Sequence, residues 1–463
     1  MTKVSILLEV EQSNDSAFEM HAAAVASETE ALRQSEQALS DLAEFGIEIT
    51  GDVEPVPMFS TKTEAHLEFG AFASADTNPD AASDTMVVAC EVPSSKLEAL
   101  RARPGTKVWP NSRLTLLDDP QATALGPDDD AVIDLADSRG GIDCRPFRPA
   151  VEIEVLRTLL GARRVWEDGY RGQNVVVGII DEGVNGDTYP VLGGFAKQGA
   201  QQPGQAPISS HGSMCAADIL VAAPAAKLYD YPFLGIPNSG GALRMFQAVL
   251  DQRRIDGTPH LTNNSYGFVG VPPQASFPNH EVHDIDHPLH RKIREVVASG
   301  AAAFFAAGNC GAQCPSAACH SSGIGPGQSI HASNALLEVI TVAAANSRHE
   351  RIGYSSQGPG MFEPQKPDVA SFSHFFGNSG PGRPAGGGVN SFDNGTSAAT
   401  PVAAGVGALL LSAMPGLTPD QIKTSLIQGA INIGAPGWDA GLGHGVVNAA
   451  ASYDILRRQG AGV

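Results

Sequence analysis

From about Val151 onward, short apolar runs alternate with helical segments, and this pattern most constrains the fold. Runs of this length, covered on both faces, are typical of strands in a parallel sheet between two helix layers. The sequence therefore predicts an α/β domain over residues 150–463, with a three-layer parallel sheet flanked by helices. The runs that define it are Val175–Ile180, Lys227–Tyr231, Leu261–Ser265, Ala301–Ala306 and Glu338–Ala344.

Residues 1–118 have a different pattern, which predicts a smaller α+β domain. Its order of strand, helix, strand, strand, helix and strand is typical of a ferredoxin-like sandwich. Residues 119–149 are rich in acidic residues, Gly and Pro and predict a linker. The expected elements are strands at Val4–Val10, Ile47–Met58, Met86–Val92 and Lys107–Leu117, a helix at Glu28–Phe45, a helix opened by a capping box at Ser95–Glu98, and a loop insertion at Glu64–Asp84.

The composition excludes several classes of partner. The 463 residues include 30 Lys and Arg against 50 Asp and Glu, a net charge of −20, which repels nucleic acid and anionic membranes. No uninterrupted apolar run reaches the roughly 18 residues of a membrane span. The opening residues also lack the basic segment and the apolar core of about 7–15 residues of a secretory signal. We therefore expect a cytoplasmic protein, with export by a route that has no readable signal left open.

Four polar residues stand at element boundaries of the predicted α/β domain. Asp181 ends an apolar run, His211 opens a helical run, Asn309 follows another run, and Ser397 precedes a long helix of small residues. Each alone has a plain structural explanation: a solvated strand end, a surface histidine, a turn or a helix cap. Because reactive groups gather at the carboxyl ends of parallel strands, we expect all four to meet.

Together these residues can carry out acyl transfer. Ser397 would attack a carbonyl, His211 would take its proton and return it to the leaving amine, and Asp181 would orient the imidazole. The side chain of Asn309 and the backbone N–H of Ser397 would stabilise the oxyanion.

The motifs around these residues resemble those of the subtilisin-like serine proteases. The similar segments are VVVGIIDEGV, HGSM, NNSYG, AAGN, YSSQGPG, KPDVA, NGTSAATP and GLGHGVVN, over about Ala150–Tyr453. The resemblance implies a serine endopeptidase with Asp181, His211 and Ser397 as its triad and Asn309 as its oxyanion residue. It also implies two substrate-binding backbone strips beside the specificity pocket: Ser265, Tyr266 and Gly267, and Ala306, Ala307 and Gly308.

The resemblance further implies a polypeptide substrate, no required cofactor and a zymogen. Residues 1–118 would be a propeptide that acts as an intramolecular inhibitor and folding chaperone, cleaved somewhere in Leu117–Arg148. Family members commonly carry a calcium-binding loop after the histidine helix, but Ile219–Pro224 continues without one. We therefore do not expect that calcium site, although calcium elsewhere stays open.

Two other departures from the family pattern matter. Ala398 follows the serine, as in the sedolisins, but those enzymes use Glu in place of His and Asp in place of Asn, so His211 and Asn309 favour the subtilisin branch. An insertion after Asn309 carries Cys310, Cys314, Cys319 and His320, which together could bind zinc. Their irregular spacing instead favours free or disulfide-paired thiols, and no metal site is predicted. Cys215 is expected to be a small core residue.

Two other functional classes were weighed. A binding protein on a protease scaffold would require a broken triad, and it would bind peptide without cleaving it. An esterase of the α/β-hydrolase type requires Gly-x-Ser-x-Gly, with the histidine after the serine. Here the sequence around Ser397 is Gly-Thr-Ser-Ala-Ala and His211 comes first, which differs from the α/β-hydrolase pattern. The sequence also shows no break in the triad, so it favours the protease over both alternatives.

Overall fold

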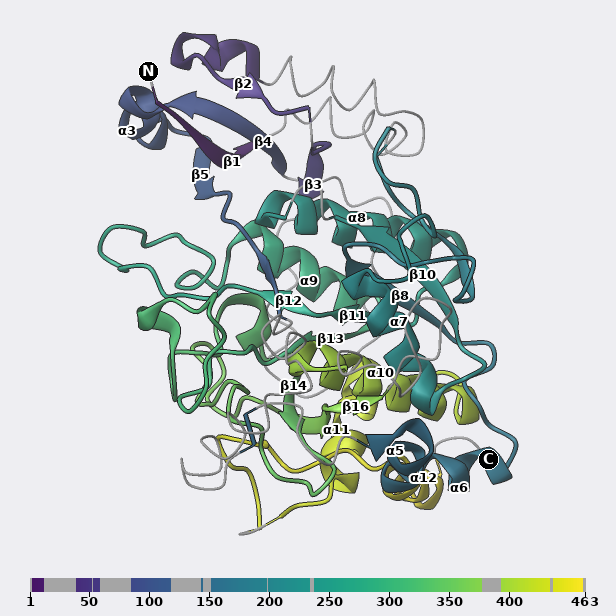
Figure 1. Ribbon diagram of the computed structural model, residues 1–463. Coiled ribbons are helices and arrows are strands. Elements are labelled where there is room, and N and C mark those ends of the chain that lie inside the picture. The colour runs from purple at the N-terminus through teal and green to yellow at the C-terminus, as the bar shows by residue number, and fades with distance from the viewer. Residues whose placement is uncertain are drawn as a thin grey trace.

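In the computed structural model a small N-terminal sheet lies against a larger α/β unit (Figure 1). The structure describes residues 2–11, 39–51, 53–58, 85–117, 143–144, 151–197, 199–233, 237–376, 393–433 and 436–460.

The N-terminal sheet is antiparallel, with strand order β2-β4-β1-β5 and β3 paired to β4. One face of this sheet packs on a small apolar core that includes Leu8, Val88 and Leu100. The elements are β1 (Lys3–Glu11), the 3-10 helix η1 (Ser40–Phe45), β2 (Glu48–Ile49), β3 (Val56–Met58), β4 (Thr85–Pro93), η3 (Ser94–Lys96), α3 (Leu97–Arg101) and β5 (Thr106–Pro110).

Three local predictions for this region were wrong. The expected strand Ile47–Met58 is split into β2 and β3. The capping box does not form, because a 3-10 turn precedes α3 and its N-cap residue, Lys96, makes no side-chain cap bond. The expected strand Lys107–Leu117 ends at Pro110, and its last residues form β6 (Thr115–Leu116) in another sheet. The loop Glu64–Asp84 lies outside the described residues, as does most of the linker and of the helix Glu28–Phe45.

The predicted parallel sheet is confirmed. It has seven strands in the order β15-β14-β13-β11-β8-β10-β9, and every neighbouring pair is parallel. The strands are β8 (Val176–Asp181), β9 (Val191–Gly194), β10 (Lys227–Pro232), β11 (Leu261–Asn264), β13 (Ala302–Ala306), β14 (Ile340–Ala345) and β15 (Val369–Phe372).

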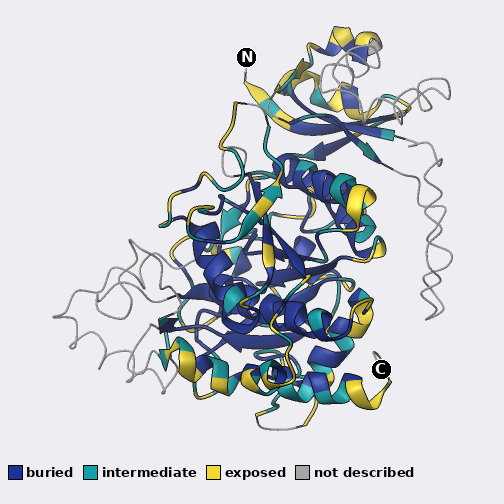
Figure 2. Cartoon of the chain, turned by 90° about the vertical axis from the view of Figure 1, so that its right-hand side faces the viewer, coloured by how far each residue is buried: buried dark blue, intermediate teal, exposed yellow. Residues whose placement is uncertain are grey.

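Helices cover both faces of this sheet, which confirms the three-layer prediction, and Figure 2 shows the buried layer between them. One apolar core joins the sheet to α5 (Ile153–Leu159), α6 (Ala162–Glu167), α7 (His211–Ala222), α10 (Gly395–Ala413), α11 (Pro419–Gly429) and α12 (Ala449–Arg458). A second core lies under α8 (Ser239–Asp256) and α9 (Pro288–Ala298). Short pieces complete the chain: β7 (Val151–Glu152), β12 (Tyr266–Gly267), η4 (Ser321–Gly323), η5 (Ala332–Ala335) and β16 (Phe375–Phe376).

Helix α10 is the central helix of the larger unit. It has 19 residues and a mean hydropathy of 1.4, enough by length and composition for a membrane span, but its apolar window is 100% buried inside the protein. It packs against α7 and against β13, β14 and β15. Its small, apolar composition is therefore accounted for by a position at the centre of the core.

Candidate active site

The carboxyl end of β8 and the first turn of α7 bring Asp181 and His211 together. The Nδ1 atom of His211 lies 2.8 Å from Asp181 Oδ1 and 3.0 Å from Oδ2, and both side chains are buried. The N-cap of α7 is Ser210, whose side chain accepts from Ser213 N and fixes the helix start. The backbone N–H of His211 donates to the Glu182 carboxylate. The imidazole is thereby held in one orientation.

The other ring nitrogen, His211 Nε2, is buried without a hydrogen-bond partner among the described residues. Burial opposes protonation of the ring, but the Asp181 carboxylate outweighs it and raises the pKa of His211 well above its ordinary value. The ring is therefore basic, with its Nε2 position available to a reacting group.

Ser397 lies in the first turn of α10, where a proline changes the backbone bonding. Pro401 lies four residues further on and has no N–H to donate to the Ser397 carbonyl. The Ser265 hydroxyl donates to that carbonyl instead, at 3.2 Å, and the Ser397 hydroxyl donates to the Ser265 carbonyl at 3.3 Å. Two reciprocal bonds thus hold the serine against the end of β11.

The side chain of Asn309 is oriented by the same helix. Its Oδ1 accepts from both the N–H and the hydroxyl of Thr396, each at 2.9 Å. The amide nitrogen must therefore point the other way, and it donates to the carbonyl of Leu117. A backbone carbonyl of the chain itself thus accepts from the amide that is predicted to bind the oxyanion.

The residues that end in Leu117 lie along the first predicted backbone strip. Strand β6 pairs antiparallel with β12, placing Leu116 opposite Tyr266 and Thr115 opposite Gly267. The Leu117 N–H donates to the Ser265 carbonyl at 3.1 Å. This is the main-chain pairing by which an extended peptide adds to a sheet edge.

The second predicted strip, at the end of β13, makes other contacts. The Ala306 carbonyl accepts from Asn334 Nδ2 at 2.7 Å, the Ala307 N–H donates to Val342 O, and the Gly308 N–H donates to Thr396 Oγ1 at 3.2 Å. These bonds tie the strip to the core and to α10. A substrate role for Ala306, Ala307 and Gly308 stays a prediction.

The cysteines of the insertion after Asn309 are paired. Cys310 bonds to Cys319, and Cys314 bonds to Cys144, across 170 residues. His320 faces Ser322, with Nδ1 2.8 Å from the hydroxyl. The insertion is thus cross-linked within itself and to the segment before the α/β unit.

Cys215 is buried, as expected for a core residue, but it also lies against the site. Its Sγ is 3.8 Å from Asp181 Oδ2 and 3.7 Å from the Ser397 carbonyl oxygen. Burial raises the pKa of its thiol above the ordinary value, which favours the neutral form.

Comparison with protein families decides what kind of site this is. The model of the Subtilase family matches residues 172–445, more than half of the chain and all four polar residues described above. The chain belongs to the subtilase family. It is a subtilisin-like serine endopeptidase that acts on polypeptides, and the resemblance of its motifs to those of this family is confirmed.

Individual relatives agree with the family assignment. Subtilisin DY of Bacillus licheniformis is 28% identical over 304 residues, which are 64% of this chain and 96% of that protein. Serine protease AprX of Bacillus subtilis (strain 168) is 28% identical over 292 residues, 56% of this chain and 61% of that one. The crystal structure of fervidolysin from Fervidobacterium pennivorans, described as a keratinolytic enzyme related to subtilisin, matches the fold with a TM-score of 0.57 at 18% identity. It covers 98% of this subtilase and 61% of the fervidolysin chain.

Sequence reasoning missed several residues at this site. Leu117 carries no motif that would place its carbonyl at Asn309, and Cys215 shows only an apolar context. Tyr354 was noted only as part of the YSSQGPG segment, yet its hydroxyl accepts from Gly395 N at 2.8 Å. Tertiary contacts that span many residues leave no periodic signal in the chain.

Proposed function

We propose that Ser397, His211 and Asp181 are the catalytic triad of this peptidase and that Asn309 is its oxyanion residue. The single observation that supports this most is the Leu117 carbonyl on Asn309, beside Ser397. The Ser397 hydroxyl donates to Ser265 O and His211 Nε2 is unpaired among the described residues, so the step requires the hydroxyl to turn from one to the other. Catalytic hydrogen bonds commonly tighten only when substrate reacts.

The proposed reaction moves one proton twice. Ser397 Oγ attacks the carbonyl carbon as its proton passes to His211 Nε2, while Asp181 stabilises the imidazolium. Asn309 Nδ2 and the Ser397 N–H receive the negative charge on the carbonyl oxygen. His211 then protonates the leaving amine and the peptide bond breaks, leaving an acyl-enzyme that water hydrolyses by the same route. The proposed chemistry uses only protein groups and water.

We propose that the first substrate is the chain itself, cut between Leu117 and Asp118. The N-terminal sheet lies over α8 and α9 (Figure 1). Arg291 Nη2 of α9 lies 2.7 Å from Glu9 Oε1, and Arg244 Nε of α8 lies 2.6 Å from Glu54 Oε2. These ion pairs support an inhibitory domain that covers the enzyme and presents its last residues to the active site.

The substrate preference follows from the side chains of that segment. Leu117 and Leu114 are buried, at 3% and 4% exposure. Leu114 belongs to an apolar cluster with Phe233 and Tyr266. We propose that the enzyme prefers an apolar side chain before the cleaved bond and another three residues earlier.

The test compares wild type with Ser397→Ala by intact mass and by labelling with a fluorophosphonate. Wild type should separate after Leu117 and take up the label, whereas Ser397→Ala should stay at 48.0 kDa and unlabelled. Ser412→Ala is the matched control, because Ser412 lies on the same helix and, among the described residues, its hydroxyl donates to Leu409 O and accepts from Gly172 N. Cleavage or labelling of Ser397→Ala would show that another residue is the nucleophile.

A further inference from the structure

The first turn of α10, which carries Ser397, is anchored from outside the helix. Its N-cap residue, Asn394, makes no side-chain cap bond. Instead, the Gly395 N–H donates to the hydroxyl of Tyr354 at 2.8 Å. Tyr354 is completely buried, so this bond is shielded from water. Ser397 lies two residues further along the chain, so the tyrosine fixes the turn that holds the serine and its backbone N–H.

The Tyr354 hydroxyl uses an acceptor site for Gly395 and must direct its own proton elsewhere. Among the residues that the structure describes, His374 Nε2 lies 3.0 Å and the Ser373 hydroxyl 3.1 Å from the Tyr354 hydroxyl. A neutral histidine has one ring donor and one ring acceptor. Because His374 Nδ1 lies 3.3 Å from Asp143 Oδ2, the ring N–H is on that side and donates to the carboxylate. Nε2 is then the acceptor that orients the Tyr354 hydroxyl.

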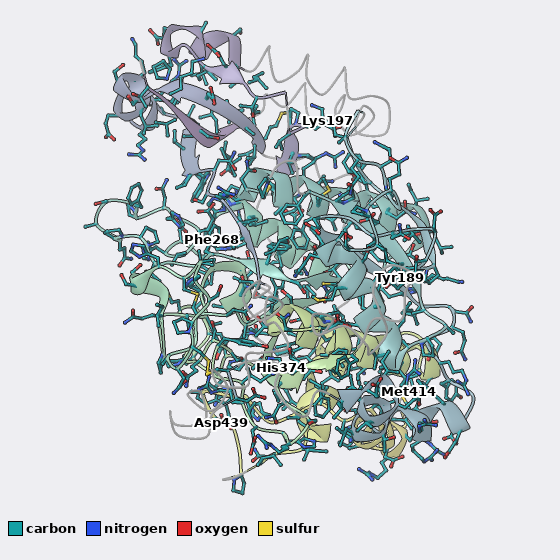
Figure 3. All side chains as sticks on the ribbon, viewed as in Figure 1. Tyr189, Lys197, Phe268, His374, Met414 and Asp439 are labelled. Carbon is teal, nitrogen blue, oxygen red and sulfur yellow. A yellow bond between two sulfur atoms is a disulfide. The ribbon has the colours of Figure 1, made fainter. Side chains whose placement is uncertain are left out.

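Asp143 and His374 are both held in place by their surroundings. Asp143 O accepts from Gly353 N at 2.7 Å, and the adjacent Cys144 is bonded to Cys314. His374, labelled in Figure 3, is 2% exposed and has a φ of +62°, a conformation that is uncommon for residues other than glycine. An unfavourable backbone conformation in a buried residue persists only where its surroundings impose it.

We propose that Asp143, His374 and Tyr354 form a relay that positions the N-terminal turn of α10 for catalysis. None of the three is proposed to contact substrate; they act through Gly395 on Ser397, and the inference rests on the proposed role of that serine. Asp143 lies beyond Leu117 in the chain, so cleavage there leaves the whole relay with the enzyme. The segment expected to be a linker thus supplies a positioning residue.

The first test is Tyr354→Phe in the full chain, measured on a peptide amide after self-cleavage. The change leaves the Gly395 N–H without its acceptor, so we expect kcat to fall about tenfold and KM to stay within about twofold, the order of effect of one unmet buried hydrogen bond. Tyr453→Phe is the matched control. It also removes the hydroxyl of a buried tyrosine, here one that donates to Asp168 Oδ2 at 3.0 Å in a part-buried bond near α6 and α12. Its kcat should match wild type.

A double-mutant cycle separates a relay from independent packing effects. Asp143→Ala alone should lower kcat to a similar extent as Tyr354→Phe, and the two together should lower it little further, because both disable one chain of bonds. His374→Asn should lower kcat about as much as Asp143→Ala, since Asn tolerates the positive φ but its amide ends near the position of Nδ1, short of the Tyr354 hydroxyl.

Three outcomes would overturn the relay: Tyr354→Phe with the kcat of Tyr453→Phe, full additivity in the cycle, or a change in KM alone. If Tyr354→Phe does not fold by circular dichroism, Asp143→Ala and His374→Asn decide the question. Failure of the proposed triad has a different signature, since Ser397→Ala would then still hydrolyse peptide. A relay that fails while Ser397 is still labelled leaves the proposed function standing.

Discussion

Two Asp–His pairs lie in the part of this subtilase that the structure describes, and the difference between them concerns the second ring nitrogen. Asp181 and Asp143 each face the Nδ1 atom of a buried histidine. His211 Nε2 is unpaired among the described residues, whereas His374 Nε2 lies 3.0 Å from the Tyr354 hydroxyl. The same pair of side chains therefore leaves one imidazole able to exchange a proton and fixes the other within a hydrogen-bond network.

The comparison teaches that a carboxylate beside a histidine does not by itself mark a proton-transfer site. What decides is whether the far nitrogen faces a reacting group. In the proposed mechanism His211 Nε2 takes the proton of Ser397, whereas His374 Nε2 faces a tyrosine hydroxyl that accepts from the first N–H of helix α10.

The largest expected effect is on kcat, and it should be much greater when Asp181 is replaced than when Asp143 is replaced. If the proposed triad is right, Asp181→Asn should lower kcat by about 10⁴-fold, because an amide can stabilise the wrong tautomer of His211 and cannot stabilise its imidazolium form. Asp143→Asn should lower kcat by no more than about tenfold, since His374 exchanges no proton with substrate. Rates on a peptide amide, normalised to the fraction of protein labelled by a fluorophosphonate, measure both. Equal losses would remove the distinction between the pairs.

The pH dependence sharpens the comparison. Protonated His211 cannot take the proton of Ser397, so kcat/KM should fall about tenfold per pH unit below the pKa of the ring. That pKa is raised, so the midpoint should lie above the ordinary value of about 6.5.

The carboxylate that raises the pKa is Asp181, so Asp181→Asn should move the midpoint of the residual activity to lower pH. Tyr354→Phe should leave it in place, because it alters the position of Ser397 and not the charge beside His211. A midpoint that moves with Tyr354→Phe would contradict the separation of the two networks.

A smaller effect on kcat is expected when the Cys144–Cys314 disulfide, next to Asp143, is removed. Replacing Cys144 and Cys314 together by Ser should lower kcat about two- to fivefold, less than Asp143→Ala, because the bonds from Gly353 N and Asn346 Nδ2 to Asp143 remain once the disulfide is gone. The free energy of unfolding should fall by about 2–4 kcal/mol, as for a disulfide that closes a long loop. Chemical denaturation and steady-state rates measure the two effects. An unchanged kcat would mean that Asp143 does not depend on the disulfide.

The smallest effect on kcat is expected at Asp230, a buried aspartate that has no imidazole partner among the described residues. Asp230 Oδ2 accepts from Val184 N at 3.0 Å and Gly204 N at 2.9 Å, and burial raises the pKa of this carboxyl to about 7. Because the pKa of the folded state exceeds that of the unfolded state, the stability that Asp230 adds is present below about pH 4 and is lost as pH rises through 7. Asp230→Asn should therefore gain about 3 kcal/mol relative to wild type between pH 5 and pH 9, since the two pH units from 5 to 7 contribute about 1.4 kcal/mol each. Thermal unfolding at both pH values tests this, and a relative loss at pH 9 would contradict it.

Much of the fold could be predicted from sequence because the relevant signals are local. The apolar runs of the larger unit are strands buried on both faces, so their composition alone indicates a parallel sheet. The four polar residues could be located because each stands next to such a run or begins a helix. These boundaries depend on neighbours within a few residues.

The errors concern contacts between distant segments. Thr115–Leu116 has the composition of a continued strand, but β12 offers it an edge in another unit and tertiary pairing overrides the local preference. The pairing of Cys144 with Cys314 could not be deduced, since spacing does not determine disulfide connectivity. The contact of His374 with Asp143 joins residues more than 200 positions apart, and Tyr354 is linked to Asp143 through His374. No local pattern in the sequence indicates these contacts.

The bond between Cys144 and Cys314 also has a consequence for where this enzyme is fully competent. Thiols stay reduced in a glutathione-rich cytosol and become oxidised in secretory or extracellular surroundings. If the relay acts as proposed, the same polypeptide would be slower in the first setting and faster in the second. Its turnover would then report the oxidation state of its surroundings without any change at the reacting atoms.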